Sequence, residues 1–209
     1  VFGVALNQLT FFKGLVLTSP VNGALLMLTT PIVVLILAIL MGKEKLTWYK
    51  AIGMTLGISG AAYLSIVSNG AQTTDAPNPL LGNIFVMINA VSYALYLINV
   101  KPMMEKYQPI TILPWIFSFG FFYCLPFGAT ELLAVEWSTI PGLDLFWIFY
   151  VLFFVTCMTY LLNGTALKIV SPSVSSAHIY MQLLIATIIS ILSGFDNLTI
   201  YTVLAGTLI

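Results

Sequence analysis

Polar side chains recur at helical spacing inside stretches of sequence that are otherwise apolar. In the stretch 80–100, the residues Asn89, Ser92, Tyr93, Tyr96 and Asn99 follow one another at intervals that place them on one face of a helix. Amides and hydroxyls donate and accept hydrogen bonds, and tyrosine rings can cover an apolar group. The stripe therefore predicts one wall of a polar cavity that binds a small amphipathic solute.

Similar stripes on other stretches predict the remaining walls of this cavity. They consist of Thr156, Thr159, Tyr160 and Asn163 in 144–167, Ser175, His178 and Gln182 in 173–193, Asn22 and Thr29 in 21–41, and Asn7 and Gln8 in 1–17. Polar groups in lipid are unfavourable unless they meet a partner or a water-filled path. For any single residue the alternative is a hydrogen bond between neighbouring helices. The stripes on 80–100 and 144–167 favour the cavity, because they hold more polar positions than helix packing requires.

Two titratable residues are candidates for a more specific role. His178 is the single histidine, and it could couple solute movement to protons near neutral pH or be a hydrogen-bonded group at a helix end. Lys13 could extend its ammonium to the lipid headgroups or bind an anionic group of the solute. Apart from Asp144, the first residue of the stretch 144–167, no Asp or Glu falls inside a predicted span, so this sequence does not predict a carboxylate proton relay.

The elements that must position these residues are membrane-spanning helices. Hydrophobic residues make up 60% of the 209 residues and charged residues only 7%, whereas roughly a quarter of a soluble domain is charged. A spanning helix needs about 20 mostly apolar residues. Eight stretches qualify, the first and last of them short: 1–17, 21–41, 47–67, 80–100, 109–129, 144–167, 173–193 and 198–209. We therefore predict an all-α polytopic membrane protein.

Turn-forming and charged residues separate the predicted spans. Breaks are expected at Ser19-Pro20, Gly42 to Lys45, Lys101-Pro102 and Ser171-Pro172, and the polar segment 68–79 is predicted to be a linker. Six of the seven lysines lie at alternate turns, namely Lys43, Lys45, Lys50, Lys101, Lys106 and Lys168. The positive-inside rule makes these turns cytoplasmic and the linker extracytoplasmic.

The sequence contains an internal repeat at an offset of 152 residues. The offset places Ser19-Pro20 on Ser171-Pro172 and Gly42 on Gly194, but it places no lysine on Lys43 or Lys45. This opposite charge placement indicates two units inserted in opposite directions, which requires an odd number of helices per unit. We predict an inverted repeat of two five-helix bundles, with ten helices in the complete protein. Residues 1–67 would then end the first unit, 68–79 would be the linker and 80–209 the second unit, in an incomplete copy that starts and stops within helices.

A set of turn and glycine motifs runs along both copies. The first copy carries Gly14 to Pro20, Pro31, Gly42 to Thr47, Gly53 and Gly57 to Gly60, and the second carries Ala166 to Lys168, Ser171-Pro172 and Gly194. These motifs resemble the EamA-like domain of the drug/metabolite transporter superfamily, with departures at Leu183, opposite Pro31, and at Asp196 in place of glutamate. The resemblance implies a ten-helix fold and the export or exchange of metabolites, with amino acids and their derivatives typical, across a bacterial inner membrane.

These features favour a secondary transporter over other classes of protein. The sequence has no Gly-x-x-x-x-Gly-Lys phosphate loop and no cluster of His, Asp and Glu, so we expect no enzyme activity, no cofactor and no metal. Zero net charge and the lack of arginine argue against a nucleic-acid partner. The alternatives are a sugar-nucleotide or phosphate-ester antiporter, which would need several buried cations, and a non-transporting membrane subunit. Gly53, Gly57 and Gly60 favour close packing within one bundle, so a monomer or weak homodimer in membrane lipid is expected.

Overall fold

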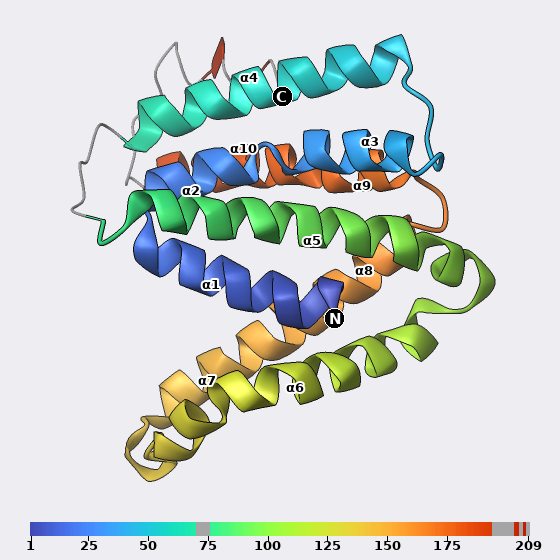
Figure 1. Ribbon diagram of the computed structural model, residues 1–209. Coiled ribbons are helices and arrows are strands. Elements are labelled where there is room, and N and C mark those ends of the chain that lie inside the picture. The colour runs from blue at the N-terminus through green and yellow to red at the C-terminus, as the bar shows by residue number, and fades with distance from the viewer. Residues whose placement is uncertain (70–75, 194–202, 205–206, 208–209) are drawn as a thin grey trace.

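The computed structural model describes residues 1–69, 76–193, 203–204 and 207, and every regular element in this part of the chain is helical (Figure 1). A short π-helical segment, η1 (Phe2–Leu6), leads into α1 (Asn7–Leu17). It is followed by α2 (Pro20–Met27), α3 (Thr30–Leu40) and α4 (Trp48–Asn69). α2 and α3 are separated only by the turn at Leu28 and Thr29, so they form one interrupted helix.

The second part of the chain begins with two long helices, α5 (Pro79–Lys106) and α6 (Pro109–Ala134). A 3-10 turn, η2 (Trp137–Thr139), precedes a continuous run of α7 (Gly142–Tyr150), the π-helical η3 (Val151–Met158) and α8 (Thr159–Ala166). The described part closes with another interrupted helix, made of α9 (Pro172–Ser176) and α10 (His178–Leu192).

Five helical runs in the described residues are long and apolar enough to cross a membrane. They are Asn22–Leu40, Pro79–Lys106, Pro109–Ala134, Gly142–Ala166 and Pro172–Leu192. The apolar run Phe2–Leu17 is shorter, α4 is not among the five, and the predicted span 198–209 falls almost wholly outside the described residues. The chain is thus an α-helical, multi-pass membrane protein, and within the described residues five of the eight predicted spans meet the length and hydropathy of a span.

The predicted break at Lys101-Pro102 is wrong, because α5 continues through both residues to Lys106. A proline inside a helix removes one hydrogen bond to the carbonyl four residues earlier, and α5 continues here with Val100 and Met104, on either side of Pro102, packed in the main apolar cluster. The helix ends instead at Tyr107 and Gln108, whose extended backbone precedes Pro109. A residue before proline is sterically disfavoured from the helical region, so the second proline and not the first marks the boundary.

Serine–proline pairs begin both interrupted helices, as the sequence predicted. The Ser19 hydroxyl accepts a hydrogen bond from the Asn22 N–H at 3.2 Å, and Pro20 occupies the first turn, where its missing N–H is harmless. Pro172 begins α9 in the same manner after Ser171. At the other end of α3, Gly42 adopts a φ of +65°, and Lys43 N–H donates to the Ala38 carbonyl at 2.8 Å. This turn sets the direction of the loop that carries Glu44.

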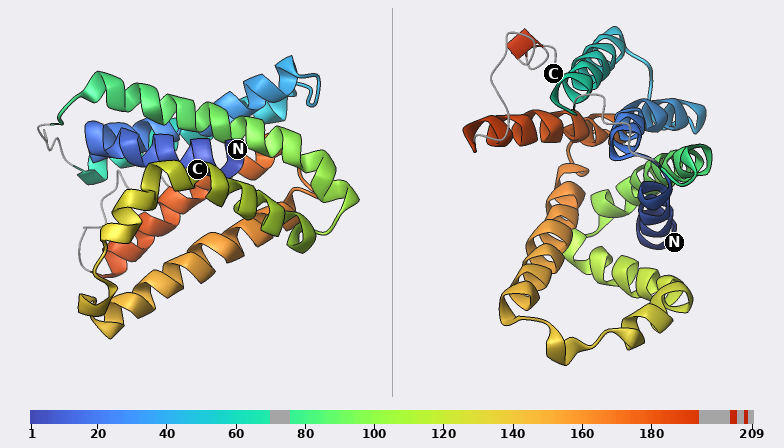
Figure 2. Two further views of the ribbon diagram at one scale, coloured as in Figure 1. Left: turned by 60° about the horizontal axis from the view of Figure 1, so that its bottom comes forward. Right: turned by 90° about the vertical axis from the view of Figure 1, so that its left-hand side faces the viewer.

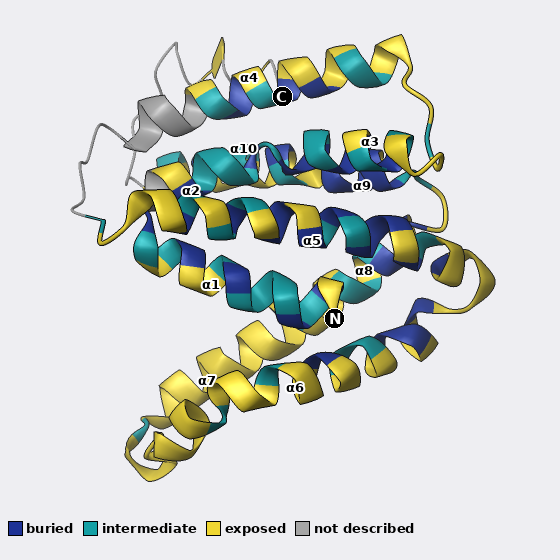
Figure 3. Ribbon diagram, in the orientation of Figure 1, coloured by how far each residue is buried: buried dark blue, intermediate teal, exposed yellow. Residues whose placement is uncertain are grey.

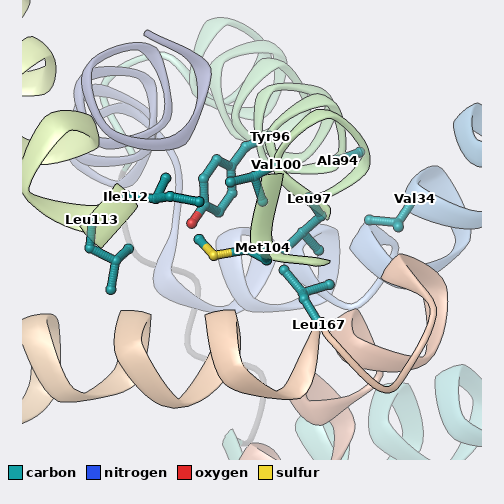
Figure 4. Packing of buried hydrophobic residues seen from close by; sticks show 9 residues of the cluster. All are labelled: Val34, Ala94, Tyr96, Leu97, Val100, Met104, Ile112, Leu113 and Leu167. Carbon is teal, nitrogen blue, oxygen red and sulfur yellow. The ribbon is translucent and has the colours of Figure 1, made fainter. Parts of the chain in front are cut away.

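α5 is the central helix of the bundle. It packs along α1 and α3 and also contacts η1 and α2, while α3 contacts α9 and α10 contacts α4 (Figures 1 and 2). The main apolar cluster gathers around α5 where α3, α6 and the end of α8 meet it (Figure 4). It comprises Val34, Ala94, Tyr96, Leu97, Val100, Met104, Ile112, Leu113 and Leu167.

The hairpin of α6 and the run 142–166 projects from this bundle (Figure 2, right). Its outer part is exposed along almost its whole length (Figure 3), and the exposed side chains include Phe146, Trp147 and Phe149. A continuous apolar surface of this size is incompatible with water as the solvent and is suited to contact with lipid tails.

The three turns that carry or adjoin the lysines lie at one end of the bundle, at the right in Figure 1. They are the α3–α4 loop (41–47), the α5–α6 turn (107–108) and the α8–α9 turn (167–171). This arrangement agrees with the alternation from which the sequence assigned them to one side of the membrane.

Candidate solute-binding site

A cavity of about 240 Å³ lies among α1, α5, α8 and the start of α10, with Met27 of α2 at its edge. Its walls carry amide, hydroxyl, imidazole and aromatic groups, and no Asp, Glu, Lys or Arg is among its described lining residues. Eight residues that the sequence placed in a solute path line it: Asn7, Gln8, Asn89, Tyr93, Tyr160, Asn163, His178 and Gln182. The structure therefore brings four of the predicted stripes together around one space.

Asn89 is the most deeply buried polar residue of this lining, with 2% of its surface exposed. Its Nδ2 donates to the Asn7 carbonyl at 2.8 Å, and Asn7 Nδ2 donates to the Asn89 carbonyl at 3.4 Å, so the pair ties α1 to α5. Asn89 Oδ1 is buried and has no hydrogen-bond partner among the described residues. A buried acceptor without a partner is rare, and this one has almost no surface accessible from the cavity.

Asn163 has a different role, because both ends of its amide are already bonded to side chains. Its Nδ2 donates to the Tyr93 hydroxyl at 3.0 Å, and its Oδ1 accepts from the Ser175 hydroxyl at 2.6 Å. The residue thereby links α8 to α5 and α9. The bond from Asn163 orients the Tyr93 hydroxyl. Because that hydroxyl accepts this bond, its own hydrogen stays free to bind another group.

Tyr160 and His178 are each held by a backbone carbonyl. The Tyr160 hydroxyl donates to the Gly3 carbonyl at 2.7 Å and so fixes η1 against α8. His178 Nδ1 lies 2.6 Å from the Ser175 carbonyl, which can only accept, so Nδ1 carries the proton. His178 Nε2 is then the ring nitrogen left for another contact. The bond to Ser175 corresponds to the interpretation of His178 as a hydrogen-bonded group at a helix end.

Seven residues of the predicted path do not line this cavity. Lys13 and Asn22 are exposed, and the hydroxyls of Thr29, Ser92 and Thr156 donate to the carbonyls of Leu26, Phe2 and Val151. Ser175 reaches the cavity only through its bond to Asn163, and Tyr96 belongs to the apolar cluster shown in Figure 4. The Ser92 bond corresponds to the alternative of a hydrogen bond between neighbouring helices, whereas the Thr29 and Thr156 bonds lie within their own helical runs.

Four further residues line the cavity without having been singled out as its ligands. Thr159 belongs to the predicted stripe on α8, whereas Phe11, Met27 and Ile179 are apolar. No pattern in the sequence distinguishes an apolar side chain that faces a cavity from one that faces lipid, so these three could not be found without the fold.

A buried carboxylate at the lysine-bearing end of the bundle joins two segments that are distant in the sequence. Glu44 has a side chain that is 4% exposed, and it forms an ion pair with Lys50 at 2.5 Å. It also accepts from the backbone N–H of Ser173 at 3.0 Å and from the Ser173 hydroxyl. Burial by itself raises the pKa of the Glu44 carboxyl, but the hydrogen bonds from Lys50 and Ser173 and the charge of Lys50 together lower it below its ordinary value.

Lys101 stabilises the neighbouring turn. Its ammonium donates to the carbonyls of Leu167 at 2.8 Å and Val170 at 3.0 Å, and it forms an ion pair with Glu105 at 2.9 Å. The carbonyls at the end of a helix lack partners within that helix, and a lysine from α5 satisfies two of them here. Glu44 and Lys101 therefore fix the two ends of the α8–α9 turn. The sequence indicated only that lysines gather on this side.

Apolar spanning helices around an uncharged, hydrogen-bonding cavity define a class: multi-pass membrane proteins that can bind a small solute within the bundle. Within this class, the chain belongs to the EamA-like transporter family, whose sequence profile matches residues 1–66 and 80–209. This is the family that its turn and glycine motifs resemble.

Curated relatives support this assignment to a family of transporters. The chain is 26% identical over 173 residues to the uncharacterized transporter YetK of Bacillus subtilis, with 83% of this chain and 52% of YetK aligned. It is also 26% identical over 192 residues to the uncharacterized transporter YyaM of the same organism, with 88% of this chain and 60% of YyaM aligned. A WAT1-related protein of Arabidopsis thaliana is 23% identical over 223 residues, covering 91% of this chain and 58% of that protein.

The chain spans between 52% and 60% of the length of these relatives. A solved crystal structure has the same fold, with a TM-score of 0.73 at 16% sequence identity. The match covers 97% of this chain and 68% of the other.

Proposed function

We propose that the protein is a secondary transporter that exports or exchanges a small metabolite, such as an amino acid or a derivative, across the bacterial inner membrane. The observation that carries this proposal is the uncharged cavity around Asn89. Its amides and hydroxyls suit a solute with hydrogen-bonding groups, and Phe11, Tyr93 and Tyr160 offer aromatic surface to an apolar part. Transport of the solute would follow alternating access.

The proposed alternating access rests on an inverted repeat of two five-helix units, complete in a ten-helix protein. Both Ser-Pro pairs begin helices that are interrupted early, after Met27 in one and after Ser176 in the other. The cavity takes Asn7, Gln8 and Phe11 from the proposed first unit and its other walls mainly from the second. A solute site at the interface of two repeats is what alternating access requires, since movement of one unit against the other then opens either side.

The alternatives are less well supported by this geometry. A sugar-nucleotide or phosphate-ester antiporter would need several lysines or arginines in the cavity, and the described lining has none. A non-transporting subunit would have no use for a cavity of this size lined by hydrogen-bonding groups. We propose that the protein acts as a monomer or weak homodimer, because Gly57 packs against Tyr180 of the same chain.

The proposal can be tested by uptake and efflux measurements. The protein, made from its complete gene and reconstituted in liposomes, should show saturable movement of a compound from a pool of labelled amino acids and their N-acetyl derivatives. Tyr93→Phe, which removes the hydroxyl that Asn163 orients, should raise the KM for that compound. Tyr96→Phe is the matched control, because the Tyr96 ring packs in the apolar cluster three residues away. If no compound moves through correctly inserted protein, the amino-acid assignment is wrong.

His178 provides a separate test of proton coupling. If the protein exchanges protons, an imposed pH gradient should change the initial rate, and His178→Gln should abolish this dependence while leaving facilitated movement intact. A gradient effect that persists in His178→Gln would assign the coupling to another group.

A further inference from the structure

A second cavity of about 340 Å³ adjoins the polar one between α1, α2 and α10. The two share four lining residues: Phe11, Met27, Ile179 and Gln182. The remaining lining of the second cavity is aliphatic or lacks a side chain beyond Cβ: Leu15, Gly23, Ala24, Leu28, Leu183 and Ala186. A space with several hydrogen-bonding side chains therefore lies next to one in which Gln182 is the hydrogen-bonding side chain of the described lining.

Small residues of α2 form one wall of this second space. Gly23 packs closely against Leu15, since a Cβ atom at position 23 would lie 2.9 Å from Cδ2 of Leu15, which is closer than van der Waals contact. Ala24 follows it in the lining, so two consecutive positions of α2 present almost no side-chain volume to α1 and α10. Any larger side chain at position 24 would reduce the apolar space without touching Asn89 or Tyr93.

We propose that the two cavities bind one amphipathic solute, with its hydrogen-bonding head in the polar cavity and its apolar tail in the second cavity. This inference rests on the proposed transport function and specifies its substrate class. The solute has no net charge, carries hydrogen-bonding groups that the Tyr93 hydroxyl and the other polar lining residues bind, and bears an aliphatic or aromatic group that lies between α1, α2 and α10. Ala24 determines the length of the tail that fits.

Area burial gives the expected size of the effect. Each methylene group that moves from water into an apolar site strengthens binding about fourfold. Affinity should therefore rise with tail length until the second cavity is full, and then stop rising. A site that binds only the head would show no such dependence.

The test uses unbranched 2-amino acids from alanine to 2-aminooctanoic acid, whose zwitterionic head is constant. With the wild-type protein made from its complete gene, the KM in proteoliposomes should fall with each added methylene. Ala24→Leu should raise the KM at least tenfold for the longest member and leave that for alanine within twofold. Ala134→Leu is the matched control, because Ala134 is exposed at the end of α6 and far from both cavities.

Binding measured separately from transport distinguishes failure of this inference from failure of the proposed function. The melting temperature of the protein in lipid nanodiscs should rise with ligand tail length, and Ala24→Leu should remove that rise. Length-dependent binding without transport would refute the proposed function and leave the site intact. Binding that is absent across the series, independent of tail length, or weakened equally for all members by Ala24→Leu would overturn the inference.

Discussion

The carboxylate of Glu44 binds both the backbone N–H and the hydroxyl of Ser173, a residue 129 positions further along the chain. The contact connects the loop after α3 to the start of α9 and so joins the two proposed repeats at the lysine-bearing end. Glu44 is also paired with Lys50, so the carboxylate has three donors in a site with little access to water.

Glu44→Gln should lower the free energy of unfolding by about 1–3 kcal/mol, because the amide keeps fewer acceptor sites and no charge for Lys50. Thermal unfolding of the two proteins in nanodiscs, followed by tryptophan fluorescence, measures the difference. Glu105→Gln is the control, since Glu105 is paired with Lys101 but its side chain is 51% exposed. An exposed pair contributes at most about 1 kcal/mol. Equal effects of the two substitutions would show that the Ser173 contact adds nothing to stability.

The lowered pKa of Glu44 predicts a pH dependence of stability with a definite sign. An unfolded glutamate has a pKa of about 4.3, and the folded value lies below it. The stabilisation from Glu44 is then fully present above about pH 4.3 and is lost as the pH falls through the folded pKa. The difference in melting temperature between wild type and Glu44→Gln should therefore be constant from pH 7 to pH 5 and shrink toward pH 3. A difference that stays constant down to pH 3 would contradict the prediction.

Lys101→Met should destabilise the protein by about 1–3 kcal/mol, because it leaves the Leu167 and Val170 carbonyls without their charged donor. Lys45→Met removes one lysine from the same side of the bundle, at an exposed position without an ion pair among the described residues. The comparison separates a structural from a topological role. If Lys101 acts only through the positive-inside rule, both variants should unfold alike and differ from wild type only in inverted insertion.

The sequence was sufficient to place most helices, since turn residues at the membrane surface have strong local preferences. Ser19-Pro20 and Ser171-Pro172 begin helices because the proline ring fits the first turn, a property that depends on neighbours in the sequence alone. Pro102 misled the prediction for the converse reason. Whether a helix continues through a proline depends on how the helix packs against other elements. The local sequence pattern of α5 does not contain that information.

The candidate site was predictable in composition and not in detail. Tyr93 and Tyr96 are one turn apart on the same polar stripe, yet the first lines the cavity and the second packs in the apolar cluster. α5 has neighbours on several sides, so one broad stripe can face two different environments. The bond between Glu44 and Ser173 was hidden for a similar reason, because helical periodicity contains no information on which loops meet.

The packing of α4 against the bundle depends on the close contact between Gly57 and Tyr180. A Cβ atom at position 57 would lie 2.6 Å from Cδ2 and 2.8 Å from Cε2 of Tyr180, whose ring is buried beside Leu28 and Ala61. Gly57→Ala should therefore destabilise the protein by about 1–3 kcal/mol through overpacking. A Cβ atom at position 53, one turn earlier, would have no other atom within 4 Å. Gly53→Ala should therefore stabilise α4 by about 0.5–1 kcal/mol through helix propensity.

Melting temperatures in nanodiscs should thus move in opposite directions for the same substitution in the same helix. Light scattering on the detergent-solubilised variants adds a second readout, because packing within one chain predicts that neither substitution changes the molecular mass. If Gly57→Ala instead shifted the mass while leaving the melting temperature unchanged, the glycine face of α4 would be a contact between two copies of the chain, and the contact with Tyr180 would not determine the position of the helix.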